Sequence, residues 1–186
     1  MTDKEKSLLQ KDIINRILPK ESGRLILAPR IGKTRIIIEL IKRDKYKSIL
    51  WVTPNVDLRD KDIPEEFIKW KAKKYLNNLK VITWKSLIKE EGYYELIVLD
   101  EEQAITENNS NSILNNKLTY NTILSMTGTK TKHSYKKEIY ELLNLKILVN
   151  LSIAEASEIG ALANYNIFVI KVPISTHRDI LAGNSK

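Results

Sequence analysis

Short apolar runs recur along the chain, and between them the apolar residues are spaced as on one face of a helix. These runs predict strands at 25–27, 49–52, 81–82, 96–99, 122–124, 147–149 and 167–172. Strands that alternate with helices are typical of an α/β fold, in which helices cover both faces of a central sheet. Several runs are apolar at every position, as expected for strands that are buried on both faces. The pattern therefore predicts an α/β protein with a central, mainly parallel sheet.

Helical spacing is clearest in residues 35–43 and 64–75, which both predict amphipathic helices. Two shorter helices are indicated by residues that favour helix ends. Ser86 is expected to cap one of them, and Ser152 is expected to cap another that Gly160 ends.

The other segments between the apolar runs are polar. Residues 106–117 are rich in Asn and Ser and predict a surface loop with a helical turn near Ile113 and Leu114. Residues 176–186 predict a polar C-terminal tail. Because the chain has no internal repeat and no clear linker, we expect residues 1–175 to form one lobe.

The composition favours a single domain in a reducing compartment. The chain has 186 residues, of which 42% are apolar, and this is enough for one sizeable core. Cysteine is absent and the only histidines are His133 and His177, which excludes disulfides and a Cys/His zinc cluster. No apolar run approaches 18 residues, and the first residues lack the order of a signal peptide. We therefore expect no membrane partner and a cytoplasmic location, or the host cytoplasm for a viral protein.

The charge of the chain suggests a polyanionic partner. There are 31 Lys and Arg residues against 23 Asp and Glu residues, a formal net charge of +8 at pH 7. Such an excess attracts nucleic acid and makes binding depend on salt. Lys-rich and Asn-rich chains are also basic through composition alone, so charge does not decide between these interpretations.

A candidate phosphate site lies where the first predicted strand leads into a helix through Gly32, Lys33 and Thr34. The first amide groups of a helix have no partner within it, and the helix dipole favours an anion there. Gly32 would let the backbone approach a phosphate, Lys33 would reach the β- and γ-phosphates, and the Thr34 hydroxyl would bind Mg²⁺. Leu27 stands where the strict pattern has glycine, so an ordinary loop before a helix is the alternative.

A second candidate site follows the apolar run at 96–99, which is followed directly by Asp100 and Glu101. Open α/β sheets bind ligands at the C-terminal ends of their strands. Asp100 would hold Mg²⁺, and Glu101 would orient and deprotonate an attacking water. A solvated acidic turn is the alternative interpretation.

With both sites in view, the chain resembles the first RecA-like lobe of superfamily 2 helicases and translocases, the DEAD/DEAH-box and Snf2-like ATPases. Four segments in the family's order carry the resemblance: 28–34 (APRIGKT) is similar to motif I, 51–55 (WVTPN) to motif Ia, 100–103 (DEEQ) to motif II and 125–129 (SMTGT) to motif III. The resemblance implies a three-layer RecA-like P-loop NTPase fold, ATP and Mg²⁺ as cofactors, and ATP hydrolysis that depends on DNA or RNA. Arg30 stands where many members have glycine, and Lys130 stands where proline frequently follows motif III.

The resemblance also assigns roles to individual residues. The catalytic residues would be Lys33, Asp100, Glu101 and Gln103, and the Mg²⁺ ligands would be Thr34 and Asp100. The nucleotide would contact Arg30, Ile31, Gly32, Lys33, Thr34, Arg35 and Gln10, the last in the place of an adenine-contacting glutamine. The nucleic acid would contact Pro54, Asn55, Thr83, Trp84 and Lys85. Nucleotide state would be coupled to lobe movement by Thr127, Gly128 and Thr129.

Several alternatives stay open. Trp51 and Trp84 suit a core as well as a ligand, because tryptophan on a strand usually packs, and Gln10 needs no ligand on a terminal helix. In the family a second RecA-like lobe supplies arginine fingers. We therefore expect slow turnover unless such a lobe, in trans or in the missing part of a longer chain, completes the cleft. A non-catalytic nucleic-acid-binding module and a different P-loop enzyme, such as a small kinase, are the alternative functions.

Overall fold

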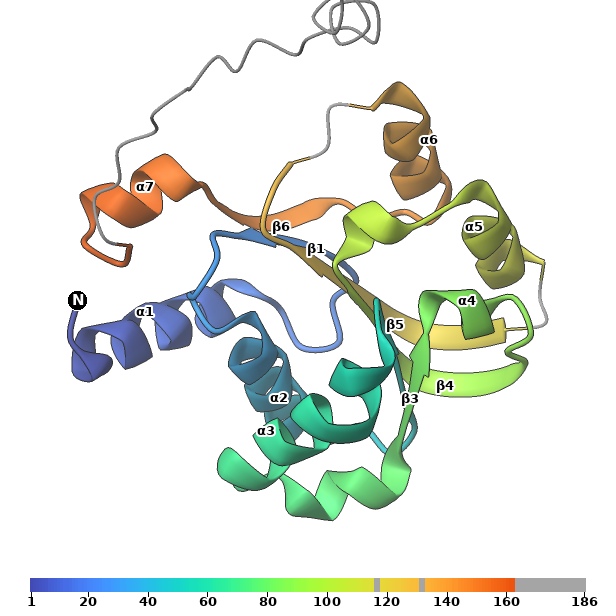
Figure 1. Ribbon diagram of the computed structural model, residues 1–186, viewed down its shortest axis with the longest axis horizontal. Helices are drawn as coiled ribbons and strands as arrows, with labels where there is room; N and C mark the ends of the chain where they lie inside the picture. Colours follow the sequence, from blue (N-terminus) through green and yellow to red (C-terminus); the bar gives the residue numbers. More distant parts are fainter. Residues whose placement is uncertain (116–117, 131–132, 163–186) are drawn as a thin grey trace, which may run out of the picture.

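The computed structural model describes residues 1–115, 118–130 and 133–162. Its centre is a six-stranded sheet in the order β3-β2-β4-β5-β1-β6, and neighbouring strands pair in parallel (Figure 1). The strands are β1 (Gly23–Leu27), β2 (Ile49–Thr53), β3 (Leu79–Thr83), β4 (Gly92–Asp100), β5 (Leu118–Thr127) and β6 (Ile147–Leu151). The α-helices are α1 (Asp3–Arg16), α2 (Lys33–Asp44), α3 (Ile63–Lys69), α4 (Trp84–Leu87), α5 (Glu107–Leu114), α6 (Ser134–Leu142) and α7 (Ile153–Glu158). Tighter or wider helical turns span Leu58–Asp62, Lys73–Asn78 and Glu102–Ala104.

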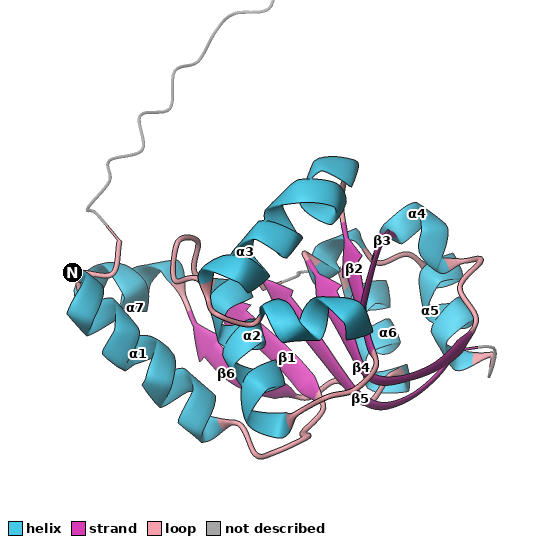
Figure 2. Ribbon diagram, turned by 90° about the horizontal axis from the view of Figure 1, so that it is seen from below, coloured by secondary structure: helices cyan, strands magenta, loops and turns pink. Residues whose placement is uncertain are grey.

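Helices cover both faces of the sheet, which makes a three-layer α/β structure (Figure 2). Helices α1, α2 and α3 pack on one face, where Ile13, Ile37 and Phe67 enter the core. Helices α5 and α6 pack on the other face through Ile113 and Ile139. Within the described part of the chain, no helix combines the length and the apolarity needed to cross a lipid bilayer.

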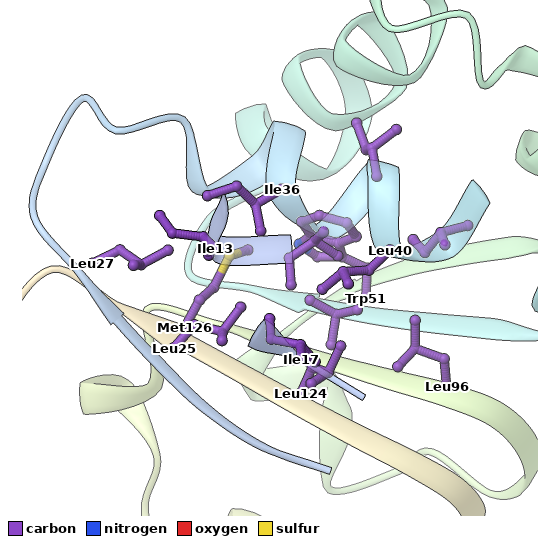
Figure 3. Packing of buried hydrophobic residues seen from close by; sticks show 14 of the residues in the cluster. Ile13, Ile17, Leu25, Leu27, Ile36, Leu40, Trp51, Leu96, Leu124 and Met126 are labelled. Atoms are coloured by element: carbon purple, nitrogen blue, oxygen red, sulfur yellow. The ribbon is translucent and has the colours of Figure 1, made fainter. Parts of the chain in front are cut away.

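Strand β2 shows why the central strands are continuous apolar runs. Successive side chains of a strand point to opposite faces of the sheet. Ile49 and Trp51 belong to the cluster beneath α1, α2 and α3, whereas Leu50 and Val52 belong to the opposite cluster. Trp51 packs edge-on against Phe67 with ring centroids 6.0 Å apart, in the layer that Figure 3 shows from close by. Both faces of the strand are buried, so no polar residues are required at alternate positions.

Most of the predicted elements are confirmed. Six predicted strands lie within β1 to β6, and the helix predicted at 35–43 lies within α2. Ser152 caps α7 by accepting a hydrogen bond from the Glu155 amide, and Gly160 follows the helix with a φ of +68°. The strand predicted at 167–172 and the tail predicted at 176–186 lie outside the described residues.

The single helix predicted at 64–75 is wrong. The α-helix ends at Lys69, and Lys71 has a φ of +55°, a conformation that ends helices. The Ala72 amide donates to the Phe67 carbonyl at 2.7 Å, and the chain continues as a separate 3₁₀ turn in which Tyr75 is buried. A charge-rich segment therefore changes direction at a lysine, which the apolar spacing alone does not reveal.

Two polar segments also differ from the predictions. Thr83, and not Ser86, precedes the first turn of α4, and the two hydroxyl oxygens are 3.1 Å apart. The loop predicted at 106–117 contains α5 instead, because Thr106 and Asn109 form a reciprocal capping box at its start. Asn109 is buried and its amide donates to the Trp84 carbonyl at 2.9 Å. The capping box and the satisfied amide of Asn109 thus explain why this Asn-rich segment forms a helix.

Candidate functional site

The candidate sites predicted from the sequence meet at one edge of the sheet. Strands β1, β5 and β4 are neighbours, and segments 28–34, 125–129 and 100–103 lie at or directly after their C-terminal ends. In a parallel sheet these ends lie at the same edge. As a result, Lys33 Nζ lies 3.0 Å from Glu101 Oε1 although the two residues are 68 positions apart in the sequence.

The loop before α2 is tightly bent. Gly32 precedes the first turn of α2 with a φ of +89°, in the left-handed region that favours glycine. Arg30 also has a positive φ, +64°, a conformation that costs a non-glycine residue about 1 kcal/mol or more. A glycine, which many members of the resembled family have at this position, would avoid that cost.

Gln10 of α1 closes one side of this loop. Its Nε2 donates to the Ile31 carbonyl at 2.6 Å, and a Cβ built on Gly32 would collide with the same nitrogen. Gln10 is buried, and its Oε1 has no hydrogen-bond partner. A buried amide oxygen without a donor is costly, because its desolvation is not compensated. Ile31 is itself fully buried, so it can contribute its backbone to a ligand but not its side chain.

Asp100 and Glu101 lie in different environments. Asp100 ends β4, and burial together with the neighbouring Glu101 carboxylate raises its pKa to about 6, against the opposing effect of Lys33. Burial alone would raise the pKa of Glu101, but hydrogen bonds from Gln103 and Lys33 outweigh it and lower the pKa below its ordinary value. Glu101 is therefore an ionised acceptor at neutral pH. A cation beside Asp100 would favour the ionised form of that carboxyl as well.

Gln103 connects the acidic pair to the loop after β5. Its Nε2 donates to Glu101 Oε2 at 2.7 Å, and its Oε1 accepts from the Thr127 hydroxyl at 2.6 Å. The Thr129 amide donates to the same Thr127 hydroxyl at 3.3 Å. A Cβ built on Gly128 would lie 3.7 Å from Lys33 Nζ. The turn at residues 127–129, which was predicted to couple nucleotide state to movement, therefore lies close to Lys33 and is linked to Glu101 through Gln103.

A buried charge network beside this site was not predicted from the sequence. The side chain of Glu102 is 2% exposed and accepts from Arg24 of β1 at 3.0 and 3.1 Å and from the Ser125 hydroxyl. The Arg24 guanidinium carbon lies 3.7 Å from the centroid of the Tyr140 ring. The sequence does show an unusual residue here, since Arg24 lies within a strand that has no other polar side chain. The order of apolar and polar residues does not show that its partner is Glu102.

The residues predicted to contact nucleic acid lie after β2 and β3. Pro54, Asn55 and Lys85 are exposed. Trp84 is 6% exposed, and its indole N–H donates to the Asp100 carbonyl at 3.0 Å. The Trp84 side chain is thus a core residue and is not available for stacking on a base, because packing beneath the Asp100 turn uses both its apolar surface and its N–H group.

A cavity of about 1050 Å³ opens beside the loop before α2. It is bounded by α1, the segment 28–34, the first turn of α2, and α3. The predicted nucleotide contacts that line it are Gln10, Arg30, Gly32, Thr34 and Arg35. On the α3 side it is lined by Asp62, Glu65, Glu66, Lys69 and Trp70.

Comparisons with known proteins bear on the fold. No protein-family model matches the chain, and no curated protein sequence matches it. Among solved structures, the UvsW helicase from bacteriophage T4 is similar with a TM-score of 0.56 and 18% identity, over 74% of this chain and 57% of that one. The Pyrococcus furiosus Hef helicase domain is similar with a TM-score of 0.54 and 15% identity, over 76% and 36%. The Sulfolobus solfataricus SWI2/SNF2 ATPase core in complex with dsDNA is similar with a TM-score of 0.50 and 19% identity, over 76% and 34%.

These similarities and the strand order define the class of the structure. The chain has a three-layer RecA-like α/β fold similar to that of these helicase and ATPase structures, which confirms the fold class predicted from the sequence. At 15–19% identity the likeness concerns the fold and not the activity. The chain spans only 34–57% of the length of these three neighbours.

Proposed function

We propose that the chain is the ATP-binding lobe of a nucleic-acid-dependent ATPase of the helicase or translocase type. The observation that carries the proposal is the contact of Lys33 at the start of α2 with Glu101 after β4, close to the turn at Gly128 after β5, at one edge of the sheet. Phosphoryl transfer from a nucleotide is catalysed mainly by positioning and by charge. A lysine, an ionised carboxylate and a compact turn at the C-terminal edge of a parallel sheet supply both.

The residues at this edge fit a nucleoside triphosphate with Mg²⁺. Gly32 leaves the start of the 12-residue helix α2 open, and such an N-terminus attracts phosphate. Lys33 would leave Glu101 and contact phosphate oxygens instead. Thr34 and Asp100 would hold Mg²⁺, which when bound neutralises charge on the phosphates. The unpartnered Oε1 of Gln10 would accept a hydrogen bond from the amino group of adenine.

Glu101 would act as the general base for hydrolysis. Its pKa is lowered by Gln103 and Lys33, so the carboxylate is ionised at neutral pH. Its basicity would rise when Lys33 leaves it for phosphate oxygens, and it could then accept a proton from a water held against it. Gln103 would keep Glu101 oriented, and the bond from Thr127 to Gln103 would transmit the state of the site to the loop after β5. The water oxygen would bond to the γ-phosphorus while the proton of the water passes to Glu101, and the bond from the γ-phosphorus to the β–γ bridging oxygen would break on the opposite side, which releases ADP.

DNA or RNA is the proposed partner. Pro54 and Asn55 follow β2, Thr83 ends β3 and Lys85 follows it, so they lie at the same edge of the sheet as the loops proposed to hold the nucleotide. The net charge of +8 supports a polyanionic partner. One similar structure, the SWI2/SNF2 ATPase core, is described as a complex with dsDNA. We do not include the Trp84 side chain, because it is buried.

A second RecA-like lobe is proposed to complete the catalytic cleft. This proposal is supported by the share of the neighbours' length that the chain spans, 34–57%. In comparable enzymes an arginine finger across the cleft contributes about 10³- to 10⁵-fold in rate. The lobe alone should therefore bind ATP and hydrolyse it slowly.

The experiment is to measure Mg-ATP binding and turnover by the purified chain, with and without single- and double-stranded DNA and RNA. Lys33→Ala should lose nucleotide binding, whereas Glu101→Gln should keep binding and lose turnover. Lys137→Ala is the matched control, because Lys137 is an exposed lysine of α6. ATP binding that survives Lys33→Ala would refute the assigned site. Nucleic-acid binding without any ATP binding would favour the non-catalytic module instead.

A further inference from the structure

The cavity beside the phosphate loop extends beyond the residues that would hold phosphates. At one end are Gly32 and Thr34, and at the other are residues of α3. The α3 end carries three carboxylates, Asp62, Glu65 and Glu66, against one cation, Lys69, which pairs with Glu66 at 2.6 Å. Carboxylates repel a polyphosphate, so this end suits an uncharged part of a ligand.

Trp70 at the α3 end is held in one orientation. Its indole N–H donates to Glu66 Oε2 at 2.6 Å. The guanidinium carbon of Arg35 lies 4.1 Å from the centroid of its ring, and Arg35 also donates to the Ser7 hydroxyl at 3.1 Å. Arg35 thus contacts both α1, through Ser7, and the end of α3, through Trp70. It directly follows Thr34, which is one of the proposed Mg²⁺ ligands. Trp70 is only half-buried, in contrast to the buried core tryptophan Trp51.

We propose that Arg35 and Trp70 form the platform on which the base of the nucleotide stacks. An indole ring with a guanidinium against it presents flat, polarisable surface, and planar bases stack on both kinds of group. The base would lie between α1 and α3, and the phosphates would extend toward Gly32. This inference rests on the proposed function and adds to it a residue pair that determines affinity for the nucleoside.

The rival explanation is that Arg35 and Trp70 only fix α3 against α2. A purely structural pair would affect every ligand of the lobe equally. A base platform would affect nucleotides but not a ligand that lacks a base. Inorganic tripolyphosphate is such a ligand, because it offers the same phosphate chain to Gly32 and Lys33.

The test is to measure binding of Mg-ATP and of Mg-tripolyphosphate to the full chain and to Trp70→Ala and Trp70→Phe, by calorimetry. Loss of one stacking contact is expected to weaken ATP binding about 5- to 150-fold in Trp70→Ala and to leave tripolyphosphate binding unchanged. Trp70→Phe should recover most of the ATP affinity, because it keeps a ring. Ile68→Ala is the matched control on α3, since Ile68 is 53% exposed and does not line the cavity.

Tryptophan fluorescence gives a second readout in the unmodified chain. Trp51 and Trp84 are buried and Trp70 lines the cavity, so ATP should quench emission and tripolyphosphate should not. The base platform would be refuted if Trp70→Ala weakened the binding of ATP and of tripolyphosphate equally, or if it left ATP binding unchanged. The proposed phosphate site would stand in either case. If the unmodified chain binds neither ligand, both the platform and the proposed function are refuted.

Discussion

Removal of one partner from the buried Arg24–Glu102 pair is expected to destabilise the lobe more than removal of both. Arg24 is 6% exposed and Glu102 is 1% exposed. The variants are Arg24→Met, Glu102→Gln, and the double variant Arg24→Met/Glu102→Leu. Methionine keeps an apolar contact with the ring of Tyr140, which lies against the Arg24 guanidinium.

The magnitude follows from the burial of the pair. A buried charge left without its partner costs about 3–5 kcal/mol, which in a domain of this size corresponds to a fall in Tm of about 6–20 °C. Replacing both partners by apolar residues of similar volume is often neutral. The double variant still leaves the Ser125 hydroxyl without its acceptor, at a cost of about 1–2 kcal/mol. It should therefore be more stable than Arg24→Met.

The assay is urea unfolding at neutral pH, followed by circular dichroism. Arg16→Met is the matched control, because Arg16 pairs with Asp12 on the surface and is 63% exposed. The loss of such a pair costs at most about 1 kcal/mol. The reasoning is refuted if Arg24→Met costs no more than Arg16→Met, or if the double variant is no more stable than Arg24→Met.

Two further variants test the local geometry. Burial acts to raise the pKa of Asp44, but hydrogen bonds from Arg43, from the Lys20 amide and from Tyr46 outweigh it and lower the pKa. The ionised Asp44 therefore stabilises the fold above its unfolded pKa of about 3.9, and this stabilisation is lost as the pH falls through the folded pKa. Asp44→Asn should cost about 1–3 kcal/mol at pH 7 and progressively less as the pH falls below about 3.9, measured by urea unfolding, and a loss that does not change with pH would contradict this. Gly32→Ala should destabilise by about 1–3 kcal/mol and weaken ATP binding, because its φ is +89° and its Cβ would collide with the Gln10 side chain. Gly92→Ala, with φ +114° and open space around the Cβ position, is the control that should keep ATP binding.

Part of the candidate site could be predicted because it depends on local order along the chain. A buried parallel strand requires apolar residues on both faces, and the residues that follow it must lie at the edge of the sheet. For this reason the positions of Lys33 after β1 and of Asp100 at the end of β4 could be predicted from the sequence. The bond between Gln103 and Thr127 depends on the strand order in the sheet, in which β4 and β5 are neighbours, and was not predicted from the sequence.

The environments of individual side chains could not be predicted, because they depend on which part of the folded chain each side chain contacts. Glu101 and Glu102 are adjacent and chemically alike, yet Glu101 contacts Lys33 and Glu102 is buried against Arg24. The φ of +50° at Glu101 turns the chain between them. Trp84 has the sequence position of a nucleic-acid contact, but its side chain packs beneath the Asp100 turn.

The sequence by itself determined the fold class and the positions of the loops that follow the strands, including the loop before α2, because hydrophobic period and glycine placement are local properties of the chain. Only the tertiary structure decided the partner of Arg24, the burial of Trp84 and the meeting of Arg35 with Trp70. These depend on contacts between residues that are far apart in the sequence. The physical reason is that a charge or a ring selects its partner only after packing has fixed which surfaces face each other.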